Sequence, residues 1–391
     1  MPRITGTYRL TRTNDEDVRA FLPYPLPPAD PPLALDGAHV ASLGAATTAV
    51  ARLAVAADLV PNAEWFLYGF VRKEALITSQ IEGTQATLQD VMAAEAGQRP
   101  QRPEDVLEVC NYVHALTHAR QELARPRGLP LATRLLCEAH KRLMRGVRGS
   151  DKRLGEIRRS QNWIGGTRPG NASFVPPPPE AVPDALSALE KWIHADDPLP
   201  PLVRVGLAHA QFETIHPFLD GNGRIGRLLI TLLFEHWGLL RSPLLYLSVA
   251  FKRHRQEYYH RLAAIRTEGD WEGWTRFFLE CVAEAADDGV VAAQRLFAVT
   301  SADRTTLANH PSATVSAIRL FEMLPANPVV TLPRAINLLH VTKPTVIKAL
   351  DALQRANILR ETTGRRRDRV YQYHRYLQVL TKDTEQISPV P

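Results

Sequence analysis

Apolar side chains recur every three or four residues over most of this 391-residue chain, in runs separated by proline, glycine or polar clusters. This spacing is typical of helices that bury one face. The pattern therefore predicts a mainly α-helical protein. Helices are expected at about residues 39–60, 63–81, 104–124, 131–145, 180–194, 200–215, 252–267 and 270–297, and a further buried helix is expected over the apolar run Ile225–Leu233.

Two stretches interrupt the helical pattern. The proline-rich stretch Pro23–Pro32 is expected to be a tether or an arm packed on the core. The polar stretch Ser301–Ser312 is expected to be a linker, and a different pattern follows it. There we expect helices at about 313–324, from Thr331 to His340 and from Pro344 to Ala356, then two short strands around a loop at Thr362–Asp368.

Composition places the chain among ordinary globular proteins. Hydrophobic residues make up 45% and charged residues 23% of the sequence. Cys110, Cys137 and Cys281 are too few and too irregularly spaced for a disulfide framework or a zinc site. No run of 18 apolar residues and no secretory signal stand out, so we expect a cytoplasmic protein with no membrane contact.

The segment His216–Arg227, HPFLDGNGRIGR, concentrates side chains that suit phosphate chemistry. Pro217 disfavours helical geometry at His216, so the preceding helix should end there and leave the imidazole on a loop as a base. Asp220 is a hard oxygen ligand that suits Mg²⁺. Gly221 and Gly223 flank Asn222 and allow backbone N–H groups to converge on an anion.

Two arginines begin the helix that follows this loop. Arg224 and Arg227 are three residues apart and share a helix face, where guanidinium groups can clamp phosphate oxygens. The positive end of the helix would point at the same anion. The alternative is a glycine-rich turn before a core helix, with a buried histidine and solvated arginines.

The segment also resembles the motif of the Fic family, HxFx(D/E)GNGRxxR, at every specified position. The resemblance implies a helical core that transfers AMP from ATP, with Mg²⁺, to a hydroxyl of a protein. His216 would be the general base, Asp220 the Mg²⁺ ligand and Phe218 a packing anchor. Nucleotide phosphates would be held by Gly221, Asn222, Gly223, Arg224 and Arg227.

A second motif lies upstream, near the end of the helix expected at 63–81. Thr78 and Glu82 are four residues apart, and Gly83 is placed to cap the helix. In isolation Glu82 is a surface carboxylate. Beside the first motif, Thr78–Gly83 resembles the family's inhibitory motif (S/T)xxxE(G/N), which implies that Glu82 pairs with Arg227 at the nucleotide site and displaces the terminal phosphate of ATP.

Two further segments fit the same resemblance. The stretch from Arg158 to Val175 resembles the family's flap, a hairpin that aligns a target segment, and would place Trp163 and Ile164 near the nucleotide; the alternative is an ordinary surface loop. Tyr258 occupies a position where the family carries an aromatic against the base, although a core tyrosine fits nearly as well.

The C-terminal pattern resembles a winged helix-turn-helix. Between Arg334 and Arg375 the sequence has ten Lys or Arg and three acidic residues, a surplus larger than the net +6 of the whole chain. DNA could be contacted, and the alternative is a protein contact with solvated arginines. The candidate DNA-binding residues are Lys343, Thr345, Lys348, Arg365, Arg366 and Arg367.

These observations divide the chain into three expected parts. They are an N-terminal arm with the inhibitory helix (1–100), a Fic catalytic core with a small hairpin flap (101–298) and a winged helix-turn-helix domain (299–391). We expect an autoinhibited protein adenylyltransferase that acts on an unknown target or on itself and forms a homodimer, as the resemblance implies. The alternatives are a DNA-binding regulator whose core senses nucleotide, and a related enzyme that removes AMP or uses another donor.

Overall fold

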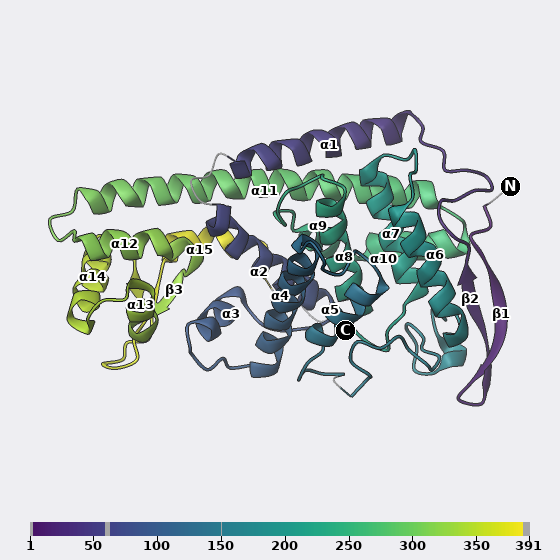
Figure 1. The fold of residues 1–391 in the computed structure, drawn as a ribbon, viewed down its shortest axis with the longest axis horizontal. Helices are drawn as coiled ribbons and strands as arrows, with labels where there is room; N and C mark the ends of the chain where they lie inside the picture. The colour runs from purple at the N-terminus through teal and green to yellow at the C-terminus, as the bar shows by residue number, and fades with distance from the viewer. Residues whose placement is uncertain (1–2, 59–62, 150, 386–391) are drawn as a thin grey trace. The chain divides into compact units, whose positions relative to one another are not determined.

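The computed structural model describes residues 3–58, 63–149 and 151–385. Within these residues the protein is mainly helical, as expected, with two small antiparallel sheets (Figure 1). The chain forms two compact units, and each draws its residues from several parts of the sequence. The first contains residues up to Ala51, Asn111–Pro243 and Leu247–Ala286; the second contains Arg52–Cys110, Leu244–Tyr246 and the residues from Asp287 onward.

The first unit begins with a β-hairpin that the sequence pattern did not predict. Strands β1 (Gly6–Thr13) and β2 (Glu16–Pro23) pair antiparallel along their whole length. Most of β1 is exposed, and its two large apolar residues, Tyr8 and Leu10, make an alternating pattern too short to distinguish a strand from a polar terminal segment. The Phe21 N–H of β2 donates to the Val175 carbonyl at 2.9 Å, which joins the hairpin to the segment expected to be the flap.

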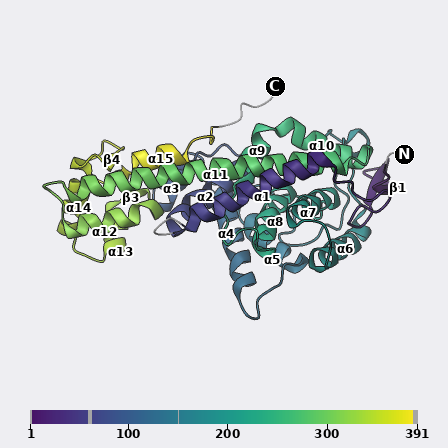
Figure 2. The ribbon, with the colours of Figure 1, turned by 90° about the horizontal axis from the view of Figure 1, so that it is seen from above.

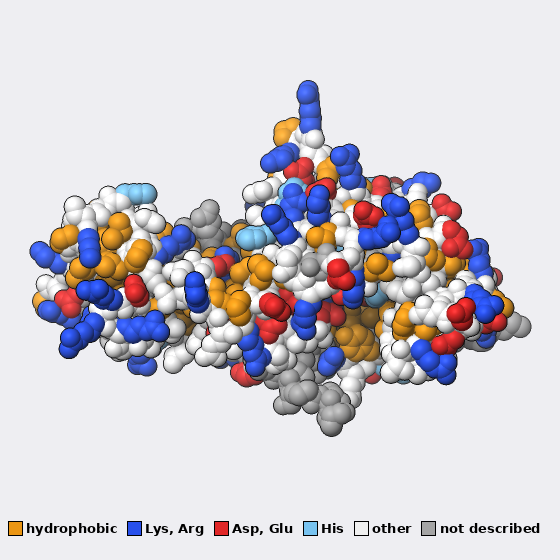
Figure 3. Space-filling model, turned by 90° about the horizontal axis from the view of Figure 1, so that it is seen from below, with side chains coloured by type: hydrophobic (Ala, Val, Ile, Leu, Met, Phe, Trp, Pro, Cys, Tyr) orange, Lys and Arg blue, Asp and Glu red, His pale blue; other side chains and the backbone are white. Residues whose placement is uncertain are grey.

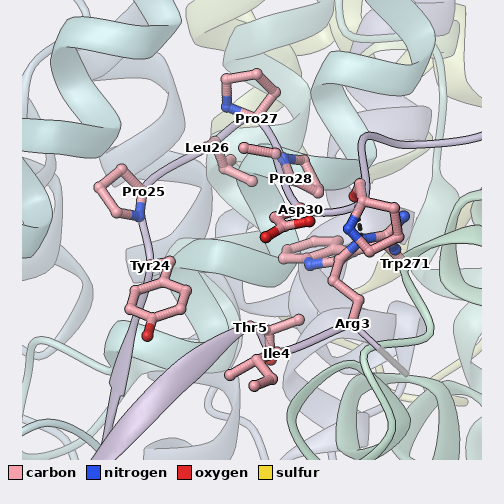
Figure 4. A pocket seen from close by; sticks show the side chains of 12 residues that line it. Arg3, Ile4, Thr5, Tyr24, Pro25, Leu26, Pro27, Pro28, Asp30 and Trp271 are labelled. Carbon is pink, nitrogen blue, oxygen red and sulfur yellow. Dashed lines mark hydrogen bonds between the residues drawn. The ribbon is translucent and has the colours of Figure 1, made fainter. Parts of the chain in front are cut away.

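The proline-rich stretch is an arm packed on this unit. Arg3 donates to both carboxylate oxygens of Glu272 at 2.7 Å and to the carbonyls of Pro31 and Pro32. The arm borders a cavity of about 660 Å³ (Figure 4). Prolines dominate its lining, together with Tyr24, Leu26 and Trp271.

Helices α7 and α8 form the centre of the first unit and lie side by side (Figures 1 and 2). Glycines allow their close packing, because a Cβ at Gly226 would lie 2.2 Å from Glu213 Oε1. Gly206 of α7 likewise allows a close approach to helix α11 (Trp271–Ala308), because a Cβ there would lie 2.8 Å from the Phe278 ring. The complete helices of this unit are α5 (Thr133–Leu143), α6 (Val182–His194), α7 (Pro201–Ile215), α8 (Asn222–His236), α9 (Leu247–Arg253) and α10 (Arg255–Thr267).

Three long helices contribute residues to both units: α1 (Gly37–Asp58), α4 (Pro103–Ala124) and α11 (Trp271–Ala308). The prediction of a linker at Ser301–Ser312 is wrong for most of that stretch, because α11 continues to Ala308. Polar residues fill this last part of the helix, yet Asp303 and Leu307 are buried. Tertiary packing therefore stabilises a segment whose composition favours a loop.

Helix α1 is also notable for its apolar composition. Its stretch Gly37–Ala56 has a mean hydropathy of 1.2 and is long enough to cross a membrane, with 28% of it buried. Core helices of globular proteins meet the same two criteria, so length and composition are weak evidence for a membrane span.

The second unit contains the remaining elements. The two helices expected after Thr331 are present as α13 and α14: Thr331 Oγ1 accepts the Arg334 N–H at the start of α13, and His340 ends that helix in a left-handed conformation. The expected hairpin is present as β4 and β5, and β3 pairs with β5 on the other side. The elements are α2 (Ala63–Ile81), α3 (Leu88–Glu95), α12 (Val315–Met323), β3 (Val329–Thr331), α13 (Leu332–Leu339), α14 (Lys343–Arg355), β4 (Arg360–Glu361), β5 (Val370–Gln372) and α15 (His374–Leu380).

Candidate active site

His216 lies where the sequence predicts it, at the C-terminal end of α7. Its backbone N–H still donates to the Phe212 carbonyl at 2.9 Å, but its φ of 50° and ψ of 62° are left-handed. Pro217 explains the stop, since a residue before proline avoids the right-handed helical region. His216 is partly exposed as a whole residue, and its Nδ1 is buried.

The turn after His216 is closed by Asn222. The Asn222 side chain accepts the Phe218 N–H and donates to the Phe218 carbonyl, both at 2.8 Å. Asn162 of the flap segment donates to the same carbonyl at 3.0 Å. Asn222 is 2% exposed, so its side chain shapes the loop from inside, and its backbone remains the part that belongs to the expected phosphate cradle.

Gly221 and Gly223 have different conformations. Gly221 precedes α8 with a φ of 74°, the left-handed geometry that the sequence analysis expected of a glycine there. Gly223 lies in the first turn of α8 and does not have a positive φ. The expected phosphate cradle thus includes the N-terminal turn of α8, whose N–H groups favour an anion.

Arg224 and Arg227 are both on α8 and are 5% and 2% exposed. Arg224 donates to the Met144 sulfur at 3.4 Å. Two buried guanidiniums thus lie near the start of one helix. Guanidinium groups suit phosphate oxygens, in line with the motif.

Asp220 can hold a divalent cation. One carboxylate oxygen accepts the Gly221 N–H at 2.7 Å, and the other faces the Lys152 ammonium group at 3.1 Å. Burial favours a higher pKa for Asp220, but the bonds from Lys152 and Gly221 and the charges of Lys152 and Arg224 lower the pKa below its usual value. An ionised carboxylate that already accepts a cation fits Mg²⁺.

The metal would need ligands beyond Asp220. Within residues 3–58, 63–149 and 151–385, no group of three or more His, Cys, Asp or Glu side chains is placed to hold an ion. Mg²⁺ commonly combines one or two carboxylates with phosphate oxygens and water. The donor set therefore fits a cation that arrives with a nucleotide.

His140 of α5 supports the same loop, a role that the sequence pattern did not predict. Its Nδ1 accepts the Gly155 N–H at 2.9 Å, so the proton is on Nε2, which donates to the Asp220 carbonyl at 3.0 Å. Its ring stacks on the Phe218 ring, with the two ring centroids 3.9 Å apart. Burial lowers the pKa of His140 to about 4, so the ring is neutral at pH 7.

The flap segment forms a short antiparallel bridge. The Ile164 N–H donates to the Phe174 carbonyl at 2.8 Å, and the reverse bond measures 3.1 Å. Ile164 is 36% exposed. Trp163 packs against a small cluster that contains Val18, Ala20 and Val175, so at least part of its ring supports the N-terminal hairpin.

Tyr258 is in the core. It is 1% exposed, its hydroxyl donates to His209 Nε2 at 2.9 Å, and its ring stacks on Phe251. The base contact expected for Tyr258 is therefore not supported, because a side chain so deeply buried has no face to offer a ligand. His209 donates from Nδ1 to the Gly226 carbonyl at 3.0 Å, and burial lowers its pKa to about 3, so it too is a structural residue.

The proposed inhibitory residues are in the second unit. Thr78 is buried on α2, and Glu82 directly follows the end of this helix and is exposed. Gly83 has a φ of 98°, and its N–H donates to the Gln80 carbonyl at 3.0 Å. Gly83 therefore ends the helix as the sequence predicts.

The candidate DNA-binding residues are at the surface of the second unit. Lys343, Lys348 and the three consecutive arginines 365–367 are exposed, and Thr345 is partly exposed. The carboxylate of Glu361 accepts the backbone N–H groups of Thr363 and Gly364, which shapes the base of the arginine loop. On the face that Figure 3 shows, Lys and Arg side chains gather over the part of the second unit that contains α12–α14.

Comparisons with known proteins agree with the motif. Residues 40–121 match the Fic/DOC family N-terminal region, and residues 130–234 match the Fic/DOC family. Two curated relatives, each called Protein adenylyltransferase Fic, come from Drosophila erecta and Drosophila grimshawi. Both are 32% identical to this chain, over 154 and 161 residues, which cover 39% and 41% of the chain.

The matched region covers 28% and 30% of these fly proteins, so this chain spans less than a third of their length. Among solved structures, a Fic family protein from Desulfovibrio desulfuricans G20 superposes with a TM-score of 0.57 at 23% identity. That comparison covers 88% of this chain and 97% of the other. It supports the helical fold described above.

Proposed function

Because two stretches of the chain match the Fic/DOC family and its N-terminal region, we propose that it is a protein adenylyltransferase, which transfers AMP from ATP to a Ser, Thr or Tyr hydroxyl of a protein. One observation carries the proposal. The segment from His216 to Arg227 contains a partly exposed histidine, an ionised carboxylate and the N-terminal turn of a helix that carries two buried arginines. These groups are the base, the cation ligand and the phosphate cradle that the reaction needs.

In the proposed reaction, His216 takes the proton of the target hydroxyl while that oxygen bonds to the α-phosphorus of ATP. The bond from this phosphorus to the bridging oxygen of the β-phosphate breaks, and pyrophosphate leaves with the electron pair. Positioned proton transfer contributes about 10²- to 10⁴-fold. Arg224, Arg227 and the first N–H groups of α8 stabilise the phosphate charge, and Mg²⁺, held by Asp220, would neutralise part of it.

Inhibition by Glu82 is part of the proposal. A guanidinium cannot bind a carboxylate and a phosphate in the same fork geometry, so Glu82 would compete with the terminal phosphate of ATP for Arg227. The motif Thr78–Gly83 and the exposure of Glu82 at a helix end support this role. A block of about 10- to 1000-fold corresponds to roughly 1.4 to 4 kcal/mol.

Incubation with α-labelled ATP and Mg²⁺ tests both parts. Glu82→Gly should raise the label on protein by about 10-fold or more, and the added change His216→Ala should abolish transfer while ATP still binds. Intact-mass measurement would show whether the protein modifies itself. Full transfer after loss of His216 contradicts the mechanism, and equal transfer by wild type and the folded Glu82→Gly variant contradicts the inhibition.

A second function is proposed for the C-terminal part. The element order helix, strand, helix, helix, strand, strand from α12 to β5 is the order expected of a winged helix, and exposed Lys and Arg side chains support the proposal. We propose that this part binds DNA through α14 and the loop between β4 and β5. Exposed Lys343, Lys348 and Arg365–Arg367 support contact with phosphates.

A further inference from the structure

Arg158 is a buried arginine that contacts both the flap segment and the loop that begins at His216, which we call the catalytic loop. It is 1% exposed. Its Nε donates to the His216 carbonyl at 2.9 Å, and one terminal nitrogen donates to the Pro177 carbonyl at 2.5 Å and the Ile215 carbonyl at 3.5 Å. The Arg158 backbone N–H also donates to the Pro217 carbonyl at 2.9 Å.

The acceptors of this guanidinium are carbonyl oxygens. Burial lowers the pKa of Arg158 to about 10, and the charge of Glu180 raises it by a smaller amount. A buried charge is a costly way to fill space, because an apolar side chain of similar size would need no hydrogen bonds. A rigid planar group with five donors is suited instead to holding two backbone segments at a fixed distance.

The two segments that Arg158 joins have different proposed tasks. His216 and Ile215 end the catalytic helix, whereas Pro177 lies where the chain returns from the flap. Asn162 makes a parallel connection, from the flap to the Phe218 carbonyl. A shift of either segment relative to the other would change the distance between a docked target and the imidazole.

We propose that Arg158 is a positioning residue that holds the flap in register with His216, so that a hydroxyl docked along the flap meets the base. The inference rests on the proposed transfer of AMP. A water molecule needs no docking on the flap to reach His216. Arg158 should therefore matter more for transfer to protein than for transfer of AMP to water.

Arg204 offers a matched control in the same unit. It is 7% exposed, and it too donates to carbonyls, those of Trp192, Ile193 and Ala195, at 2.9 to 3.2 Å. It lies near the start of α7, whereas His216 follows the end. Twelve residues of helix separate the two by roughly 18 Å, at 1.5 Å per residue.

The test compares Arg158→Lys, Arg158→Met and Arg204→Lys in the full chain that carries Glu82→Gly. One reaction with α-labelled ATP yields two products, AMP on protein and free AMP. For both Arg158 variants we expect transfer to protein to fall by about 10- to 100-fold, the effect of a displacement of about 1 Å, while free AMP changes by less than about 3-fold. Arg204→Lys should leave the ratio of the two products unchanged.

Hydrogen exchange provides a readout that does not depend on activity. The N–H of Ile164 reports on the flap bridge, and the N–H groups of His216 and Phe218 report on the catalytic loop. In Arg158→Lys both sets should exchange faster, by a similar factor, and in Arg204→Lys neither should change. An unchanged product ratio, or unchanged exchange, in a folded Arg158→Lys protein overturns the inference; a Glu82→Gly parent that transfers no AMP overturns the proposed function instead.

Discussion

Replacement of Lys152 by Met should tighten the binding of divalent cations. The Lys152 ammonium group lies 3.1 Å from Asp220 Oδ2, and the two side chains are 47% and 37% exposed. At the proposed metal site, Mg²⁺ would compete with this ammonium group for the carboxylate. The variant removes the competitor and leaves the metal ligand in place.

The size of the effect follows from the exposure of the pair. An ion pair that is close to half exposed is screened by water and contributes about 0.2 to 1 kcal/mol. At about 0.59 kcal/mol for RT, this range corresponds to a roughly 1.4- to 5-fold lower Kd for the metal. Loss of a positive charge beside the bound ion acts in the same direction, so the larger values in this range are expected at low salt.

The assay is the binding of Mn²⁺, followed by its electron spin resonance signal without nucleotide, and of Mg²⁺ by calorimetry. Lys141→Met is the control, because Lys141 is exposed on α5 beside His140 and its replacement changes the net charge equally. Asp220→Asn should lose the site. If Lys152→Met binds Mn²⁺ no more tightly than wild type, the ammonium group does not compete with the metal.

Two further predictions concern His140 and the basic loop. The pKa of His140 is about 4 in the folded protein and about 6.5 in the unfolded chain. Between these two pH values the unfolded chain binds more protons than the folded protein. The free energy of unfolding should therefore fall as the pH falls, by about 1.4 kcal/mol per pH unit for this residue. Urea denaturation at several pH values should show a shallower fall in His140→Phe, and an equal slope would contradict the buried neutral ring. For DNA, replacement of Arg365–Arg367 by Gln should weaken binding in a gel shift and reduce the slope of log affinity against log salt by up to about 3. Arg304→Gln on α11, which loses a pair with Glu322, should change that slope little, and an unchanged slope in the triple variant would exclude the loop from the contact.

Local sequence was sufficient for the catalytic loop. Pro217 dictates the end of α7 and Gly221 the turn before α8, because each restricts or frees the backbone at its own position. The positions of most helices also follow from the spacing of apolar residues. The same local reasoning predicted the capping of α2 by Gly83 and of α13 by Thr331.

Contacts between distant segments could not be predicted in this way. His140 and Asp220 are 80 residues apart, and Arg158 and His216 are 58 apart. Nothing in the sequence around Arg158 or Lys152 distinguishes a buried or ion-paired cation from a solvated one. The sequence also could not show which of two adjacent tyrosines is buried. Tyr258, chosen as the base contact, is 1% exposed, whereas Tyr259 is 44% exposed.

The N-terminal hairpin limits the direction from which a partner strand can join the flap. Phe174 pairs with Ile164, and the next carbonyl, that of Val175, accepts from Phe21 of β2. The 174–175 segment therefore bonds to Ile164 on one side and to β2 on the other. Because backbone groups alternate along a strand and those of Ile164 turn inward, an incoming peptide would pair with the backbone of Trp163, on the outer side.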